Sequence, residues 1–332
     1  MEMKAILKQL FEYRSLDFSQ AKEVMLRMSE GAYNEHELSS FMTVYLMRTI
    51  TIDELLGFRE ALLSLALPLD LQQENLLDIV GTGGDGKNTF NISTLACFVV
   101  AGAGIKIAKH GNYGASSISG ASNVMEQMGY VFTNHQDVLK SQLEEAGICF
   151  MHAPLFHPAL KLVAPIRKNL SMRTFFNMLG PIVNPAAPSA QLLGVSSLEL
   201  ARIYTYLLQK TSKKFTIIHS LDGYDEISLT HDAKIITQHG EQIKMPEILA
   251  GINVNADELA GGATKEDAAK IFMNILEGNG TEAQEKVVIV NAAIGLQCAE
   301  AYEKYDDAFA AAEESLKSKK ALQCLKKLIA TQ

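Results

Sequence analysis

The sequence predicts an α/β protein: a small all-helical domain followed by a larger α/β domain with a mostly parallel central sheet. Two observations indicate this. Residues 1–68 show only helical apolar spacing, whereas after Leu76 short apolar runs alternate with amphipathic segments. Alternating strand and helix patterns are typical of βαβ units, whose strands run parallel. We therefore expect one domain at 1–68 and another at 69–332.

Helix start signals organise the first 68 residues. Residues 16–31 carry apolar side chains on one helical face and end at a glycine. Asn34 with Glu37, and Thr51 with Glu54, have the spacing of a capping box at the start of two further helices. Short helices with apolar faces must bury them against each other, against the rest of the chain or against a second subunit.

Short apolar runs are the expected strands of the larger domain, and two amphipathic runs between them are expected helices. The strand candidates are 76–80, 105–108, 130–132, 148–153, 192–197 and 215–220, and the helix candidates are 135–147 and 197–211. Segments 225–230 and 233–240 resemble a later, more exposed hairpin, and 286–299 is apolar enough for a buried helix. Parallel sheets of this kind bind ligands beyond the C-terminal ends of their strands.

Charge and composition exclude several classes of protein. The net charge of -8 argues against broad binding to nucleic acid or to anionic membranes. No apolar run reaches membrane-spanning length, and the first residues lack the apolar core of a signal peptide. The four cysteines, Cys97, Cys149, Cys298 and Cys324, lie far apart, which favours reduced thiols in a cytoplasmic protein.

A glycine-rich segment, GTGGDGKNTFNIST at 81–94, follows the first expected strand. Glycines between a strand and a helix expose backbone N–H groups, and the helix N-terminus adds partial positive charge, so the segment favours phosphate. Other interpretations stay open from the residues alone. The dinucleotide fingerprint lacks its acid about 20 residues on, the nucleotide P-loop lacks its hydroxyl at Asn88, and a plain tight turn needs no ligand.

The 40 residues from 86 to 125 contain no Asp or Glu. With 38 acids in 332 residues, average composition would place between four and five there. The window instead holds eleven Ser, Thr or Asn and six glycines, together with Lys87, Lys106, Lys109 and His110. Burial explains its apolar half but not the polar stretch at 109–123. Two donor-rich loops after consecutive strands would lie side by side and could hold a polyanion larger than one phosphate.

An acidic cluster follows the strand candidate at 215–220. Asp222, Asp225 and Glu226 supply the oxygen ligands that magnesium prefers, and polyphosphates commonly bring magnesium. A solvated acidic turn is the alternative, because Asp-Gly is a common turn pair. Asp85 inside the glycine segment is tolerated near phosphate if it accepts from ribose hydroxyls, loop N–H groups or metal-bound water.

Six segments in order resemble the anthranilate phosphoribosyltransferases, over nearly the whole chain. They are GTGGD at 81–85, NIST at 91–94, KHGN at 109–112, HPALKLVAPIR at 157–167, RTFFNMLGPIVNPA at 173–186 and DGYDEIS at 222–228. The resemblance implies a fold like that of the nucleoside phosphorylases and phosphoribosyltransferases. It also implies that helices from about 167–190 complete the helical domain, and that the helical domains form a homodimer.

The resemblance implies transfer of the phosphoribosyl group from phosphoribosyl pyrophosphate to the amine of anthranilate, with Mg²⁺, in tryptophan biosynthesis. The implied contacts to the donor are Gly81, Gly84, Asp85, Thr89, Asn91, Ile92, Ser93, Thr94, Lys109, His110, Gly111, Asn112, Ser116, Ser117 and Ala121. The implied anthranilate contacts are Gly81, Asn112 and Arg167, and the implied metal ligands are Ser93, Asp225 and Glu226. No general base is required: Lys109 would act electrostatically, and His110 is a candidate proton relay.

Two departures from the family pattern affect the donor site. The family commonly has arginine after KHGN, where this chain has Tyr113 followed by Gly114. The family commonly has serine first after the later glycine, where this chain has Ala121 before Ser122. Phosphate contacts at 113 and 121 therefore stay open. Alternatives are an enzyme like the pyrimidine nucleoside phosphorylases, a related phosphoribosyltransferase with another acceptor, and a non-catalytic nucleic-acid-binding relative.

Overall fold

The computed structural model describes residues 2–71, 73, 75–114 and 117–332, and the chain divides into two compact units. The first unit contains Met1–Leu69 and Ala153–Ala187, and the second contains Asp70–His152 and Pro188–Gln332. Each unit is thus built from two separate stretches of chain.

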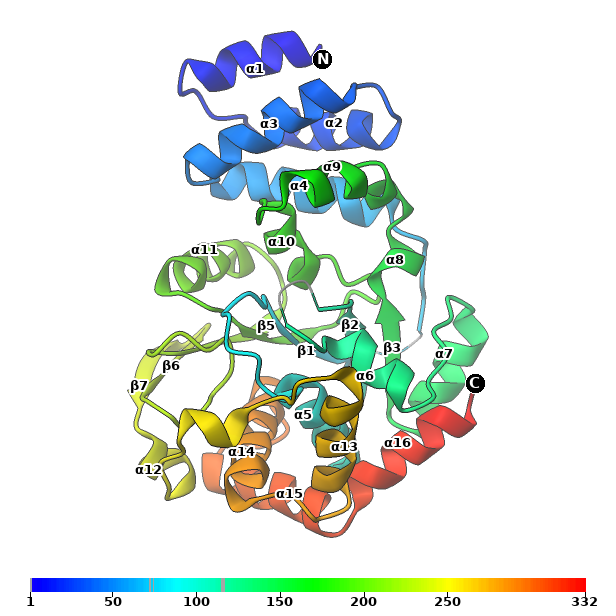
Figure 1. Cartoon of the computed structure of the whole chain (residues 1–332), viewed down its shortest axis with the longest axis vertical. Coiled ribbons are helices and arrows are strands. Elements are labelled where there is room, and N and C mark those ends of the chain that lie inside the picture. Colours follow the sequence, from blue (N-terminus) through cyan, green and yellow to red (C-terminus); the bar gives the residue numbers. More distant parts are fainter. Residues whose placement is uncertain (1, 72, 74, 115–116) are drawn as a thin grey trace. The chain divides into compact units, whose positions relative to one another are not determined.

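The described part of the first unit is entirely helical (Figure 1). Its two stretches contain α1 (Met3–Phe11), α2 (Phe18–Ser29), α3 (Glu35–Met47), α4 (Ile52–Leu65), α8 (Ala153–Phe156), α9 (Ala164–Leu170) and α10 (Phe176–Leu179), with 3-10 turns at Pro158–Lys161 and Gly180–Ile182. The capping boxes predicted at Asn34 and Thr51 are present, because each side chain accepts from the backbone N–H three residues on and the glutamate there bonds back.

An aromatic cluster forms the core of the first unit. The rings of Phe41, Tyr45, Phe58 and Phe175 lie with centroids 4.9 to 6.1 Å apart. Gly57 permits a close crossing of α2 and α4, because a Cβ there would lie 2.5 Å from the carbonyl oxygen of Phe18. The helices therefore bury part of their apolar faces against each other and against the second stretch of the unit.

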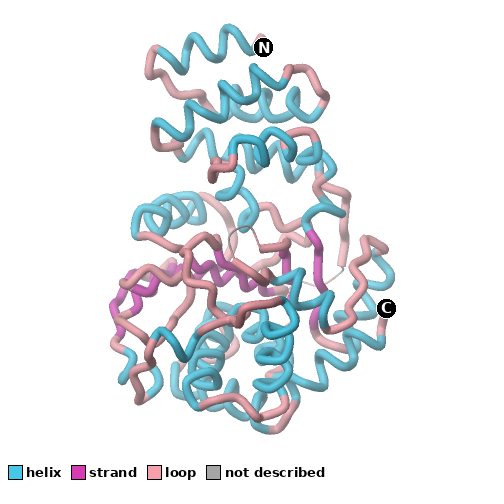
Figure 2. The backbone as a smooth tube through the Cα atoms, in the orientation of Figure 1, coloured by secondary structure: helices cyan, strands magenta, loops and turns pink. Residues whose placement is uncertain are grey.

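A seven-stranded sheet lies at the centre of the second unit (Figure 2). Its strands are β1 (Leu77–Gly81), β2 (Ile107–Gly111), β3 (Ile148–His152), β4 (Ala190–Gly194), β5 (Lys214–Ser220), β6 (Ala233–Thr237) and β7 (Gly240–Lys244), in the order β3-β2-β1-β4-β5-β6-β7. The first five strands in this numbering pair in parallel and the last two antiparallel, which confirms the mostly parallel sheet.

The C-terminal ends of the parallel strands lie at one edge of the sheet. Gly81 of β1 is in register with Gly194 of β4, and Gly111 of β2 is in register with His152 of β3. The loops that follow these strands therefore start from the same edge. This is the edge where the sequence predicted a ligand site.

Helices cover both faces of the sheet (Figure 1). Helices α5 (Ile92–Gly102) and α14 (Glu282–Cys298) pack on one face, and α11 (Leu198–Gln209) packs on the other. The remaining elements are α6 (Ala121–Gln127), α7 (Gln136–Glu145), α12 (Pro246–Ala250), α13 (Lys265–Leu276), α15 (Tyr305–Lys317), α16 (Lys320–Ala330) and the 3-10 turn Ala256–Leu259. Most of α14 is buried, as its apolar sequence predicted. Within the described residues, no helix is long and apolar enough to cross a membrane.

Two strand predictions were wrong. Residues 130–132 form a loop after α6, where Tyr130 donates to Gln142 and Phe132 packs on Phe150. Residues 225–230 are irregular and mostly buried, and Asn291 of α14 exchanges both hydrogen bonds with the backbone of Ile227. At Ile227 the Asn291 amide satisfies backbone groups that a neighbouring strand would have satisfied, whereas at 130–132 the phenol bond of Tyr130 and aromatic packing hold the loop in place.

Candidate functional site

The glycine loop connects the end of β1 to the start of α5. Gly83, Gly84 and Gly86 have φ values of 63°, 81° and 73°, a left-handed region that strains residues with a Cβ. This backbone explains the density of glycines, which the sequence alone left open to a plain tight turn. Asn91 is the N-cap residue of α5, so the N-terminal end of α5 follows directly after this loop.

The acidic turn after β5 is bonded to this loop. The N–H of Gly83 donates to Asp225 Oδ2 at 2.6 Å, and the N–H of Ser93 donates to Glu226 Oε1 at 3.1 Å. Thr89 Oγ1 lies 3.4 Å from the second Glu226 oxygen. A Cβ at position 81 would lie 2.4 Å from Asp225 Oδ2, so the approach requires Gly81. The structure thus brings together predicted donor-binding residues and predicted metal ligands that are distant in sequence.

The two carboxylates lie in a strongly acidic, buried setting. Asp225 is 7% exposed and Glu226 is 8% exposed. Burial, followed by the charge of Asp85, raises the pKa of Asp225 to about 7. Burial, followed by the charge of Asp225, raises the pKa of Glu226. The ion pairs of the described residues include neither carboxylate, so no side-chain cation compensates them.

This donor set fits a magnesium ion that arrives with a phosphate ligand. Two buried carboxylates without an ion-pair partner among the described residues are oxygen donors of the kind that Mg²⁺ uses, and Ser93 lies next to them, since its N–H donates to Glu226. Among the described residues, no group of three His, Cys, Asp or Glu side chains is placed as a complete metal cage. Asp222, the third acid of the predicted cluster, instead accepts from the hydroxyl of Thr230.

The loop between β2 and α6 lies beside the glycine loop, as expected for donor-rich loops after neighbouring strands. Asn91 Nδ2 donates to the carbonyl of Ser119 at 2.9 Å, and the N–H of Ile118 donates to Asn88 Oδ1 at 3.3 Å. Asn123 Oδ1 accepts from the N–H groups of both Gly114 and Gly120. Asparagine side chains therefore organise this pair of loops.

The side chain of Lys109 points into the core of its unit. It is 2% exposed, and Nζ donates to the carbonyl of Ile79 at 2.8 Å. His110 is buried next to it, and its backbone N–H lies 3.3 Å from Asp78 Oδ1. Lys87 is exposed, and its ammonium lies 4.5 Å from the centroid of the Tyr224 ring. The positive charges of the predicted phosphate window thus differ sharply in exposure.

The other predicted residues occupy varied positions. Asp85 Oδ1 accepts from the N–H of Lys87 at 3.1 Å, one of the roles open to a carboxylate in this loop. The remaining donor-site residues are Gly84 in the loop, Ile92 and Thr94 buried in the first turn of α5, Gly111 at the end of β2, Asn112 exposed after it, Ser117 half-buried and Ala121 first in α6. Ser116 lies outside the described residues.

Arg167 belongs to the first unit, whereas Gly81 and Asn112, the other predicted anthranilate contacts, belong to the second. Arg167 lies in the last turn of α9. Its guanidinium lies 5.4 Å from the centroid of the Phe176 ring, and Nη2 lies 3.5 Å from Asn177 Oδ1. Burial lowers its pKa. The arginine is thus partly desolvated and has no carboxylate partner among the described ion pairs.

Sequence reasoning missed several residues that shape the site. Gly83 donates to Asp225, Asn88 and Asn123 organise the neighbouring loop, and Gly194 permits close approach of the acidic turn. A Cβ at Gly194 would lie 1.6 Å from the carbonyl oxygen of Asp225. A glycine inside the predicted strand at 192–197 was the one available signal for this approach.

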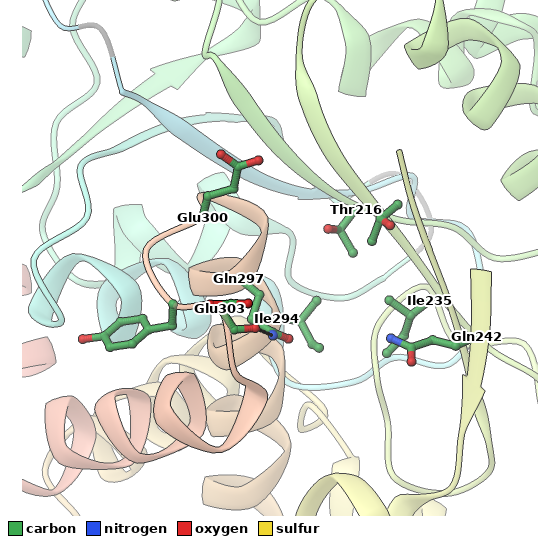
Figure 3. Close-up of a pocket in the computed structure, with 9 residues that line it drawn as sticks. Thr216, Ile235, Gln242, Ile294, Gln297, Glu300 and Glu303 are labelled. Atoms are coloured by element: carbon green, nitrogen blue, oxygen red, sulfur yellow. Dashed lines mark hydrogen bonds between the residues drawn. The ribbon is translucent and has the colours of Figure 1, made fainter. Parts of the chain in front are cut away.

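A separate cavity of about 340 Å³ lies elsewhere in the second unit. Figure 3 shows Thr216 and Ile235 on the strands, opposite Ile294 and Gln297 on α14. Thr216 is paired with Thr237 near the beginning of β5, whereas the acidic turn follows the end of that strand. This cavity is therefore distinct from the loops that carry the predicted donor contacts.

The fold and the site define a class of protein. The family model described as glycosyl transferase family, a/b domain, matches residues 73–322, and the model of the helical bundle domain of that family matches residues 4–66. The chain is thus a glycosyltransferase with a helical bundle and an α/β domain, and its glycine loop meets a buried acidic turn in the α/β part.

Relatives identify the family within this class. The chain is 54% identical to anthranilate phosphoribosyltransferase of Bacteroides thetaiotaomicron over 98% of each chain, and 56% identical to that of Flavobacterium johnsoniae over 98% of each. It belongs to the anthranilate phosphoribosyltransferase family. The family resemblance, the fold class and the enzymatic activity predicted from the sequence are confirmed.

Solved structures agree with this family assignment. The crystal structure of anthranilate phosphoribosyltransferase from Thermus thermophilus superposes with a TM-score of 0.92 at 31% identity, over 98% of each chain. The Saccharomyces cerevisiae enzyme in complex with PRPP and Mg superposes with a TM-score of 0.91 at 26% identity, over 99% of this chain and 97% of the other.

Proposed function

We propose that the chain transfers the phosphoribosyl group of phosphoribosyl pyrophosphate to the amine of anthranilate, releasing pyrophosphate. The observation that carries this proposal is the pair of bonds from Gly83 and Ser93 to Asp225 and Glu226. These bonds join the glycine-rich loop and the start of α5 to a buried acid pair that has no ion-pair partner among the described residues. A polyphosphate with a divalent cation satisfies both groups at once.

The glycine loop, the first turn of α5 and the loop after β2 bind the donor in this proposal. Their backbone N–H groups and hydroxyls address phosphate oxygens, and Thr94 offers a buried hydroxyl with no partner among the described residues. Lys109 contributes a buried positive charge, whose field is strong in a low-dielectric interior. Since charge grows on the departing pyrophosphate, these fixed donors stabilise the transition state more than the ground state.

Asp225, Glu226 and Ser93 would hold Mg²⁺. The ion supplies positive charge that neutralises the leaving pyrophosphate. The yeast relative that was solved with PRPP and Mg supports this assignment. In this proposal the surrounding residues keep the carboxylates of Asp225 and Glu226 buried from water and close together, so that the pair needs a cation.

Arg167 and Asn112 would bind anthranilate. A guanidinium with no carboxylate partner suits the substrate carboxylate through charge-assisted hydrogen bonds. The aromatic amine of anthranilate is neutral at pH 7, so its lone pair needs positioning and no strong base. His110 would at most relay the released proton.

A fluorescence assay of anthranilate consumption tests the proposal. Turnover requires anthranilate, phosphoribosyl pyrophosphate and Mg²⁺ together, and omission of any one abolishes it. The Arg167→Ala variant raises the KM for anthranilate far more than the KM for the donor. No turnover with all three components present would refute the reaction, and equal effects on both KM values would refute the role of Arg167.

Assembly and location complete the proposal. A homodimer through the helical unit is supported by its exposed apolar side chains, Phe11, Tyr13 and Met47. Sedimentation equilibrium measures this directly, and a monomer at micromolar concentration would contradict it.

A cytoplasmic location fits the four free cysteines.

A further inference from the structure

The side chain of Tyr113 is held on two sides although it is 44% exposed. The phenol donates a hydrogen bond to Glu126 Oε1 at 2.6 Å. The ring meets the imidazole of His152 edge to face, with centroids 4.8 Å apart. An exposed aromatic residue in a loop is thus anchored to both α6 and β3.

His152 is itself fixed in place. It is the last residue of β3 and is in register with Gly111 of β2, so it lies next to the start of the loop that carries Tyr113. Its Nδ1 lies 2.9 Å from Ser122 Oγ, and its ring stacks on Phe132 at 4.5 Å. Tyr113 therefore rests on a rigid support that belongs to the sheet edge.

The backbone of Tyr113 orients its neighbour Asn112. The N–H of Tyr113 donates to Asn112 Oδ1 at 2.8 Å, and the carbonyl of Asn112 accepts from the N–H of Ser122 at 3.1 Å. A backbone N–H bonds only to the oxygen of a side-chain amide, so these contacts settle which way the amide points. Asn112 is left with its NH₂ group as a donor, which is the group that a substrate carboxylate accepts from.

Two glycines of the loop lie in close backbone contact directly after Tyr113. Gly114 and Gly120 approach so closely that a Cβ on Gly120 would lie 2.2 Å from the nitrogen of Gly114, and both N–H groups donate to Asn123. Tyr113 is thus the last residue before this contact between Gly114 and Gly120. Because Gly114 on the C-terminal side of Tyr113 is held in this contact, a shift of the Tyr113 ring would instead move Asn112 on its N-terminal side.

We propose that Tyr113 is a positioning residue for the anthranilate carboxylate, acting through its bond to Glu126 and its contact with His152 to hold the amide of Asn112. This inference rests on the proposed function, since it assumes that Asn112 contacts anthranilate.

A double-mutant cycle between Tyr113 and Glu126 tests the anchor. Tyr113→Phe keeps the ring on His152 and loses the phenol bond, so the KM for anthranilate rises about three- to tenfold while the donor KM and kcat stay within about twofold. Glu126→Ala gives the same pattern, the double variant is no worse than either single one, and Glu126→Gln, which keeps an acceptor, restores most of the loss. Tyr206→Phe, in an exposed position on α11, serves as the matched control.

A second measurement separates positioning from a merely structural role. Because the chain has no tryptophan, anthranilate fluorescence reports its binding without an indole background. In an Asn112→Ala background, Tyr113→Phe has no further effect on anthranilate affinity if it acts through Asn112. Additive effects of the cycle, or a rise confined to the donor KM, would overturn the inference. Wild-type protein that shows no turnover would instead refute the proposed function, so the two failures are distinguishable.

Discussion

Each unit of the chain buries acidic side chains, but the two sites differ in whether a neighbouring cation balances the buried charge. In the helical unit, Glu54 is fully buried and pairs with Arg48. In the α/β unit, Asp225 and Glu226 are buried beside each other without an ion pair among the described residues. The first site contains its own cation, whereas the second has none among the described ion pairs, and under the proposed function Mg²⁺ would supply it.

The bonds to Glu54 show how a buried acid is satisfied. Arg48 Nη1 donates to Oε2 at 3.0 Å, and Tyr45, Thr51 and Leu16 donate to the same carboxylate. Burial acts to raise the pKa of Glu54, but the hydrogen bonds from Arg48, Thr51 and Leu16 outweigh it and lower the pKa overall. At Asp225 the hydrogen bond from Gly83 does not outweigh burial and Asp85, so the pKa rises. Glu54 is therefore satisfied within the fold, whereas under the proposed function the acid pair would be satisfied by a bound cation.

The largest expected effect is the loss of activity when the acid pair is neutralised. Asp225→Asn with Glu226→Gln keeps the shape of both side chains and an oxygen that accepts from Gly83 and Ser93. We expect kcat/KM to fall about 10⁴-fold, because the metal loses both of its carboxylate ligands and the charge of the leaving group is then no longer neutralised. Steady-state kinetics over a range of Mg²⁺ concentrations measures this. Activity within tenfold of wild type would show that the acid pair holds no essential metal.

The second effect is on stability in the helical unit. Arg48→Met leaves Glu54 buried without its cation and should lower the free energy of unfolding by about 3 to 5 kcal/mol, measured by urea denaturation. Arg14→Met is the matched control, because Arg14 pairs with Glu12 at an exposed site and should contribute less than about 1 kcal/mol. Equal effects of the two variants would contradict the distinction between a buried and an exposed pair.

The third effect has the opposite sign. Without Mg²⁺ and at about pH 9, above the raised pKa of about 7 of Asp225, the Asp225→Asn and Glu226→Gln variant should be about 1 to 3 kcal/mol more stable than wild type, because uncompensated buried charge is removed. Added Mg²⁺ should stabilise wild type, by about 1.4 kcal/mol at ten times its Kd, and leave the variant unchanged. Thermal unfolding with and without EDTA measures both. A variant less stable than wild type in EDTA would mean that the carboxylates support the fold as Glu54 does.

The same contrast shows what the sequence could predict. The capping box from Thr51 to Glu54 follows from spacing within one helix. The ordered motifs predicted the family, and the alternation of strand and helix patterns predicted the mostly parallel sheet. The bond from Gly83 to Asp225 joins residues 142 positions apart. It requires β4 to lie between β1 and β5, which no local pattern encodes.

Local patterns also failed where burial replaced strand pairing. Residues 130–132 and 225–230 have the apolar content of strands. Side-chain contacts of Tyr130 and Phe132 hold the first segment, and Asn291 bonds to the backbone of the second at Ile227. Tyr113 was recognisable as a departure from the family pattern, yet its partners Glu126 and His152 could not be predicted. Their contacts depend on the register of β2 with β3 and on where α6 begins.

The smallest effect concerns pH and isolates Glu54. Because the folded pKa of Glu54 is lowered, the unfolded chain binds more protons as pH falls, so this carboxylate stabilises the fold above its ordinary pKa of 4.5 and loses that contribution below it. Glu54→Gln removes this titration while other carboxylates still titrate. The difference in unfolding free energy between wild type and Glu54→Gln should therefore be largest near pH 6 and shrink toward pH 3, measured by urea denaturation at each pH. A difference that grows on acidification would show that burial dominates at Glu54 as it does at Asp225, and the contrast between the two sites would be lost.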